Sequence, residues 1–175
     1  RVIRDILSPE VDKLIIDSKH EYEKVLDYLD IISPDLKSKV HLFNLREGTL
    51  FDVYGMEEEI EKSLKQKVWL KSGGYIVIDH TEALTVIDVN TGKFVGSESL
   101  ADTVLKTNLE AAAEIARQIR LRNTGGIIVI DFIDMETSDH QERVLKALEE
   151  AVKKDRTKAN ILGITQLGLV EMTRK

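Results

Sequence analysis

Two apolar runs, each of which stops at an aspartate, constrain the fold of this chain more than any other feature. The first is ALTVIDVNTGK, residues 83–93, and the second is GGIIVIDFIDM, residues 125–135. Each run is rich in Ile and Val and is bounded by Gly, Asn or Asp, which is typical of a buried β-strand. A carboxylate in an apolar strand is costly unless a partner compensates its charge. The pattern therefore marks Asp88 and Asp131 as candidates for a paired or metal-bound site.

The spacing of the polar side chains in these runs predicts where they point. If the two strands are neighbours, Asp88 and Asp131 reach the same edge of one sheet. Oxygen ligands that leave positions open for water and phosphate are those that Mg²⁺ prefers. Asn90 follows Asp88 by two residues, so in an extended segment it lies on the same face and could orient a carboxylate or a water. Aspartates at strand ends are also common as turn formers and helix caps, so the spacing alone leaves both interpretations open.

Three segments of the chain resemble the catalytic region of the ribonuclease E/G family of bacterial endoribonucleases. They are GGYIVIDHTEALTVIDVNTGKFVG, TNLEAAAEIARQIRLRNTGGIIVIDFIDM and HQERVLKALEEAVKKDR, and the similarity extends from Arg1 to Lys175. The resemblance implies a magnesium-dependent endoribonuclease that prefers single-stranded RNA and acts in RNA processing and mRNA decay. It also implies that Asp88 and Asp131 hold one Mg²⁺ per chain and that Asn90 forms a hydrogen bond in the same catalytic site.

Composition sets broader limits on the chain. Its 175 residues suit one domain or two small ones, and 42% hydrophobic with 32% charged residues is ordinary for a globular protein. No apolar run approaches the roughly 18 residues that a membrane span needs, and no signal peptide stands at the start, so we expect a cytoplasmic protein with no membrane segment. Residue 1 is Arg rather than Met, which predicts a fragment or a processed chain. Cysteine is absent, so these residues contain neither a disulfide nor a cysteine-bound zinc.

The charge distribution gives mixed evidence on nucleic-acid binding. A net charge of −6 argues against a broad nucleic-acid-binding surface. Residues 143–175, however, contain eight Lys or Arg against four Asp or Glu. This strip could contact RNA phosphates, but a solvated helix face explains most of these charges equally well. Lys158 is a weaker candidate for RNA contact, because the family resemblance places a basic residue at about this position.

The first 67 residues predict a small α/β unit without an obvious chemical site. Strand, helix, strand and helix are expected in turn over residues 12–17, 20–32, 39–44 and 56–67. The resemblance implies that residues 1–67 are the incomplete structural part of a ribonuclease H-like subdomain whose other strands come from further upstream.

Residues 68–175 predict the α/β unit that contains the candidate site. We expect an antiparallel hairpin that turns around residues 79–83, a helix over residues 102–122 ended by Gly125, and a second helix that opens with a capping box at Ser138 and Gln141. One or two strands follow, which gives a mixed sheet with helices on both faces. The resemblance implies a deoxyribonuclease I-like subdomain. Asp134 is a weaker candidate for the metal or its water, provided that the chain bends back after Asp131.

The chemistry that follows is hydrolysis by a metal-activated water, with 5′-phosphate and 3′-hydroxyl products. The resemblance also implies an upstream RNA clamp, a 5′-end sensor and a zinc-linked homo-oligomer, none of which lies in these residues, so we expect weak activity from this chain alone. A non-catalytic RNA-binding or scaffold module is the alternative. A deoxyribonuclease or phosphoesterase of similar fold would need a histidine near the carboxylates, and the four histidines are poorly placed for that role.

Overall fold

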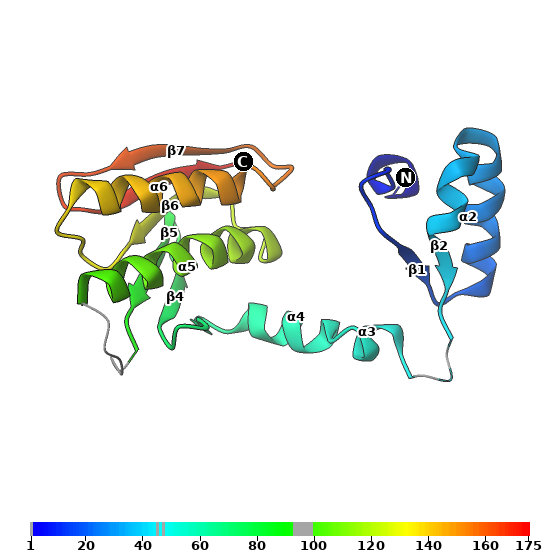
Figure 1. Cartoon of the computed structure of the whole chain (residues 1–175), viewed down its shortest axis with the longest axis horizontal. Coiled ribbons are helices and arrows are strands. Elements are labelled where there is room, and N and C mark those ends of the chain that lie inside the picture. Colours follow the sequence, from blue (N-terminus) through cyan, green and yellow to red (C-terminus); the bar gives the residue numbers. More distant parts are fainter. Residues whose placement is uncertain (1, 45, 47, 93–99) are drawn as a thin grey trace. The chain divides into compact units, whose positions relative to one another are not determined.

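The computed structural model describes residues 2–44, 46, 48–92 and 100–175 of the chain (Figure 1). Its contacts divide the chain into two compact units, Arg1–Glu59 and Ile60–Lys175. Helix α4, Met56–Leu64, spans this boundary, with acidic residues in its first turn and Lys62 in its last turn, as the helix dipole favours. The helix ends before residue 67, where it was expected to end, because Lys67 already begins a strand.

The first unit is built around a short pair of parallel strands. Its elements are α1 (Val2–Ile6), β1 (Leu14–Ile16), α2 (Lys19–Ile32), the 3₁₀ helix η1 (Pro34–Lys39), β2 (Val40–Leu42) and α3 (Leu50–Val53). Strands β1 and β2 pair in parallel, and α2 forms the crossover between them. The Ser18 hydroxyl accepts a hydrogen bond from the Glu21 amide and caps α2. Leu29 of α2 and Val40 of β2 are buried in this unit.

The second unit is a six-stranded mixed sheet with the strand order β3-β4-β5-β6-β8-β7. Its strands are β3 (Lys67–Trp69), β4 (Tyr75–His80), β5 (Leu84–Asn90), β6 (Gly126–Asp131), β7 (Ala159–Ile164) and β8 (Val170–Arg174). Strands β5 and β6 are parallel, and every other neighbouring pair in the sheet is antiparallel. The predicted α/β class with a mixed sheet is therefore confirmed, and so is the hairpin of β4 and β5.

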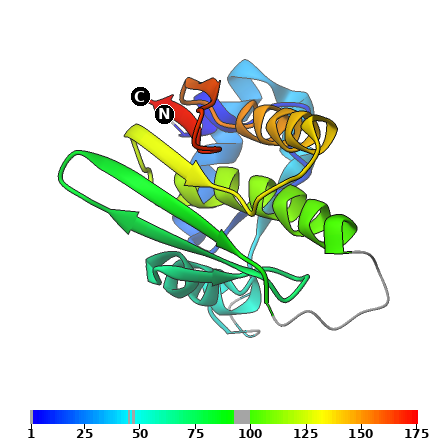
Figure 2. The same cartoon turned by 90° about the vertical axis from the view of Figure 1, so that its left-hand side faces the viewer.

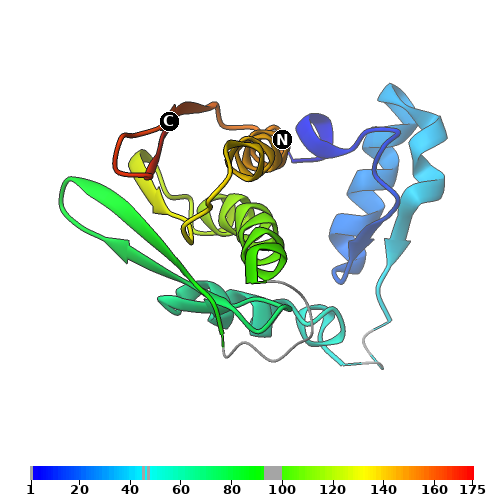
Figure 3. The ribbon, with the colours of Figure 1, turned by 60° about the vertical axis from the view of Figure 1, so that its left-hand side comes forward.

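Two helices, α5 (Leu100–Leu121) and α6 (Ser138–Val152), form the second layer of this unit. Figures 2 and 3 show both helices along the same side of the strands. In the core, small and branched side chains of the two helices pack against every second side chain of the strands. The helix residues include Ala111, Ala112, Ile115 and Leu148, and the strand residues include Ile76, Ile87, Ile130 and Met172. Complete burial of each large apolar side chain stabilises the fold by about 1.5–3 kcal/mol.

The expectation of helices on both faces of the sheet was wrong. In β5 the side chains of Thr85, Ile87 and Val89 are buried, whereas Val86 and Asp88 between them are exposed. Strand β6 alternates in the same way. Because α5 and α6 lie on one face, the described residues leave the other face of the sheet open to solvent. We call it the open face, and the candidate site lies on it.

Two further helix boundaries differ from the prediction, the end of α5 and the start of α6. Asn123, rather than Gly125, takes the left-handed conformation after α5, with a φ of 50°. Asparagine tolerates that conformation because its short side chain can form local hydrogen bonds. The N-cap of α6 is Thr137 rather than Ser138, since the Thr137 hydroxyl accepts the hydrogen bond from the His140 amide. In the described part of the chain, none of the helices is both long and apolar enough to cross a membrane.

Candidate functional site

Strand pairing places Asp88 and Asp131 side by side. The two residues are register partners at the end of the parallel pair β5 and β6, where the strands are about 4.8 Å apart. Their neighbours Ile87 and Ile130 point into the core, so both carboxylates point to the open face. The two strands are therefore neighbours, as a shared site for both carboxylates requires.

Asn90 forms a hydrogen bond with one member of this pair, Asp88. Its Nδ2 donates a hydrogen bond of 2.7 Å to Oδ2 of Asp88. The bond fixes the rotation of the Asp88 carboxylate and leaves the second carboxylate oxygen, Oδ1, for another ligand. The period of two along a strand thus puts both side chains on the open face, as the sequence predicted.

Negative charge accumulates at this end of the sheet. The pKa of Asp131 is raised, first because partial burial disfavours the ionised form and then because of the negative charges of Asp88 and Asp134. Asp134 contributes to this negative charge from the segment that directly follows β6. Like charges on neighbouring strands destabilise a sheet unless a cation offsets them.

The donor set fits a hard divalent cation such as Mg²⁺. Two exposed carboxylates on rigid neighbouring strands supply oxygen ligands, and Mg²⁺ commonly uses one or two carboxylates and takes its remaining ligands from water and phosphate. Among the described residues, no cluster of three or more His, Asp or Glu side chains could hold a metal ion. Asp88 and Asp131, which are register partners, would hold the ion, and the role of Asp134 stays a prediction.

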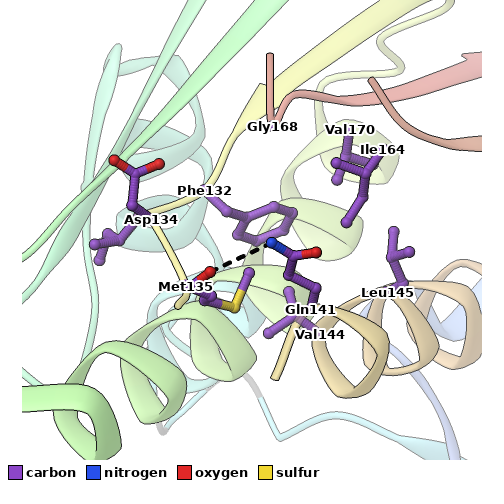
Figure 4. A pocket seen from close by; sticks show the side chains of 10 residues that line it. Phe132, Asp134, Met135, Gln141, Val144, Leu145, Ile164, Gly168 and Val170 are labelled. Carbon is purple, nitrogen blue, oxygen red and sulfur yellow. Dashed lines mark hydrogen bonds between the residues drawn. The ribbon is translucent and has the colours of Figure 1, made fainter. Parts of the chain in front are cut away.

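A small pocket lies beside Asp134, between the end of β6 and the start of α6. It has a volume of about 50 Å³ and is lined by Phe132, Ile133, Asp134, Met135, Gln141, Val144, Leu145, Ile164, Gly168 and Val170. Figure 4 shows Gln141 donating a hydrogen bond of 3.3 Å to the carbonyl oxygen of Met135, with Asp134 at the rim. Because ligand pockets usually have volumes of about 300–1,000 Å³, this one is too small for a nucleotide.

Comparison with known proteins identifies the family. A model of the Ribonuclease E/G family matches residues 1–175. The chain belongs to the ribonuclease E/G family. This membership confirms the resemblance that the two aspartate-ending strands and the helix between them first indicated.

Curated relatives match along the whole chain. Ribonuclease G of Escherichia coli (strain K12) is 51% identical over 175 residues, which are 100% of this chain and 36% of the relative. Ribonuclease G of Haemophilus influenzae is 50% identical, with 100% and 35% coverage. Ribonuclease E of Nostoc sp. is 44% identical over 177 residues, with 100% and 26% coverage. The chain thus spans about a third of the length of the ribonuclease G relatives.

The structure of this ribonuclease E/G family chain separates Lys158 from the carboxylate pair. Lys158 precedes Ala159 of β7, which pairs with Arg174 of β8, and Arg174 in turn pairs with Gly126 at the start of β6. Asp131 is at the opposite end of β6, and at about 3.3 Å per residue the strand separates it from Gly126 by roughly 16 Å. RNA contact by Lys158 is therefore a separate proposal, apart from the carboxylates.

His80 is also at the far end of the sheet, where its Nδ1 contacts the Thr85 hydroxyl at 2.9 Å.

Asn108 of α5 holds the segment that follows Asp131, a role that was not predicted from the sequence. Its side chain is fully buried and bonds the backbone of Ile133 in both directions. Nδ2 of Asn108 donates to the Ile133 carbonyl at 2.8 Å, and the Ile133 amide donates to Oδ1 at 3.1 Å. The sequence does contain a signal for this role, because Asn108 interrupts the apolar stripe between Leu105 and Ala112.

Replacing Asn108 by Leu should destabilise the chain by about 2–3 kcal/mol, since it leaves the part-buried amide and carbonyl of Ile133 without the side chain that bonds them. The free energy of unfolding, measured in urea, checks this. Thr107→Val, at the neighbouring and similarly buried position, is the matched control and should cost less. A Leu variant as stable as the parent would refute the role assigned to Asn108.

Proposed function

We propose that this chain contains the metal-binding catalytic part of an endoribonuclease that cleaves single-stranded RNA with Mg²⁺. The observation that supports this most directly is the register pairing of Asp88 with Asp131 on an open sheet face, with Asn90 bonded to Asp88. The substrate class is supported by relatives whose names are ribonuclease G and ribonuclease E. The roles of Asp88, Asn90 and Asp131 belong to this proposal.

Each of these side chains has a defined task in the proposed reaction. Asp88 and Asp131 would hold the cation, and Asn90 keeps the Asp88 carboxylate oriented toward it. A bound Mg²⁺ supplies Lewis acidity, lowers the pKa of water and offsets charge on the phosphate. The oxygen of water forms a new bond to phosphorus, the bond from phosphorus to the 3′ oxygen breaks, and that oxygen takes up a proton. The products are therefore a 5′-phosphate and a 3′-hydroxyl.

The subdomain assignment and the setting of the whole protein are part of the same proposal. We assign residues 1–67 to an incomplete ribonuclease H-like unit, which is supported by the parallel pair β1 and β2 with its crossover helix. Residues 68–175 are assigned to a deoxyribonuclease I-like unit, which the six-stranded mixed sheet supports. Action in RNA processing and mRNA decay, a cytoplasmic location and a homo-oligomeric full-length protein stay predictions.

Magnesium should both stabilise the chain and switch on cleavage. Binding to the folded state raises stability by about 2.7 kcal/mol at a concentration one hundred times Kd, so the melting temperature should rise with Mg²⁺ and fall again with a chelator. Cleavage of a fluorescent single-stranded RNA should require Mg²⁺ and leave 5′-phosphate ends. We expect slow cleavage, because the chain spans only 36% of its Escherichia coli relative.

The same measurement separates the proposal from the non-catalytic alternative. The alternative is a non-catalytic RNA-binding or scaffold module in which the aspartates only end strands. The net charge of −6, which argues against a broad nucleic-acid-binding surface, favours the scaffold form of this alternative. Such a module would show neither a magnesium-dependent melting temperature nor cleavage, and this pair of results would reject the catalytic proposal. Products with a 2′,3′-cyclic phosphate would reject water as the nucleophile.

A further inference from the structure

An aromatic and cationic cluster lies on the open face of the sheet, in the edge strand β3 and in β4, which pairs with β5. It consists of Lys67 and Trp69 of β3 and Tyr75 of β4. The rings of Trp69 and Tyr75 meet edge to face, with their centroids 5.3 Å apart. The Lys67 ammonium lies over both rings, 4.2 Å from the Trp69 centroid and 3.5 Å from the Tyr75 centroid. We call these three residues the aromatic cluster.

Strand register places the aromatic cluster beside the carboxylates. Tyr75 is the register partner of both Trp69 and Asn90, so these three side chains form one row across β3, β4 and β5. Lys67, Val77 and Asp88 form the next row in the same way, and Asp131 extends it. With strands about 4.8 Å apart and about 3.3 Å per residue, the Cα atom of Tyr75 lies roughly 8 Å from that of Asp88, and the Cα atom of Trp69 roughly 12 Å.

The exposure of the aromatic cluster requires an explanation. Trp69 is 65% exposed, although the adjacent Val68 and Leu70 are buried in the core. A tryptophan on an edge strand can simply shield that strand, and the Lys67 contact would then serve the fold alone. That explanation does not account for why the exposed Trp69 ring, the half-buried Tyr75 ring and the Lys67 ammonium share one face of the sheet, and adjoining rows, with Asp88 and Asn90.

Aromatic rings beside a positive charge are the combination that single-stranded nucleic acids bind. Bases stack on the rings irrespective of sequence, and cationic side chains follow the phosphates. We propose that the aromatic cluster is a subsite that stacks a base of single-stranded RNA, while Lys67 contacts a phosphate of the same strand. The RNA would run across the open face from the aromatic cluster toward Asp88 and Asp131. This inference rests on the proposed function, because it takes that RNA as the ligand.

Trp69 is the single tryptophan of the chain, so its fluorescence reports directly on the subsite. The experiment titrates Asp88→Asn protein without Mg²⁺, which prevents cleavage, with a single-stranded oligoribonucleotide of about ten nucleotides, within the usual site size of one binding fold. Stacking should quench the tryptophan emission as RNA is added. A matched DNA duplex, whose bases are already stacked, should quench much less.

Substitutions then separate stacking from a merely apolar contact, with the anisotropy of labelled RNA as the readout. Trp69→Leu and Tyr75→Ala should each weaken binding roughly 5- to 100-fold, whereas Trp69→Phe, which keeps a ring, should retain most of it. Tyr54→Ala, at an exposed tyrosine that directly follows α3, is the matched control and should bind like the parent. Thermal melting confirms that each variant is folded.

The outcomes distinguish this inference from the proposed function. Quenching by RNA together with weakened Leu and Ala variants supports the subsite even if the parent chain cleaves nothing. Magnesium-dependent cleavage without quenching, or with a Trp69→Leu variant that binds and cleaves like the parent, overturns the subsite and leaves the catalytic proposal intact. Weakening by Tyr54→Ala to the same degree would also overturn it.

Discussion

Asp88→Asn and Asp131→Asn should each lower magnesium-dependent RNA cleavage by at least about 100-fold. Losing a residue that only supports a metal ligand typically costs about 10- to 100-fold, and losing a ligand itself should cost more. Because the two carboxylates are register partners, neither can replace the other on the opposite side of the ion. Single-turnover cleavage of labelled single-stranded RNA, with Mg²⁺ varied, measures the effect.

The structure offers a matched control for these two variants. Asp79 is an exposed aspartate on the adjacent strand β4, but it pairs with Val86 near the far end of the sheet, and Gln66 donates a hydrogen bond of 2.7 Å to it. Asp79→Asn should cleave like the parent. Equal losses at Asp79, Asp88 and Asp131 would mean that a general change of charge, rather than a metal site, governs cleavage.

Measurements of the free energy of unfolding should show whether the Asp131→Asn variant loses activity without losing its fold. Asp131 is held beside two negative charges, and its pKa is raised by partial burial and by those charges. Removing one of a pair of like charges on neighbouring strands should therefore stabilise the metal-free chain, by about 0.2–1 kcal/mol. An Asp131→Asn variant that is inactive yet at least as stable as the parent is the expected combination.

Arg174→Leu should destabilise the chain by about 3–5 kcal/mol, the largest stability effect that we expect, because the substitution leaves a buried carboxylate without its partner. Arg174 and Asp155 form an ion pair at 2.8 Å, with side chains only 3% and 7% exposed. Nη1 of Arg174 also donates to the carbonyl of Thr124 at 2.8 Å and to Oδ1 of Asn123 at 3.2 Å. The free energy of unfolding in urea measures the loss.

The pH dependence of this loss has a defined sign. The hydrogen bond from Arg174 lowers the pKa of Asp155 in the folded chain below its usual value. The pair therefore stabilises the fold above the ordinary aspartate pKa of about 3.9, and this contribution disappears as the pH falls through the lower folded-state value. Urea unfolding at neutral and acid pH should show the gap between parent and Arg174→Leu narrowing in acid.

A surface ion pair provides the comparison. Lys153 and Glu150 are joined at 2.6 Å, but their side chains are 66% and 61% exposed. Lys153→Ala should cost at most about 1 kcal/mol, because water screens and replaces the interaction. Similar losses in the Arg174 and Lys153 variants would mean that burial does not determine what each ion pair contributes to stability.

Local sequence patterns predicted much of the site. The two apolar runs became β5 and β6, and the period of two put Asp88 and Asn90 on one face. The helix predicted between the strands over residues 102–122 became α5, Leu100–Leu121. These features are predictable because the repeats of strands and helices are properties of consecutive residues.

Other features depended on contacts between distant segments. The sequence did not show that α5 and α6 share one face of the sheet, or that Asn108 holds the turn after β6. It also could not place Lys158 far from Asp131, nor set Trp69 beside Tyr75 and in register with Asn90. Each of these depends on which helices and strands become neighbours in the folded chain. The sequence alone therefore determined the strands and the carboxylates, whereas burial of the shared apolar face under two helices decided which of them meet.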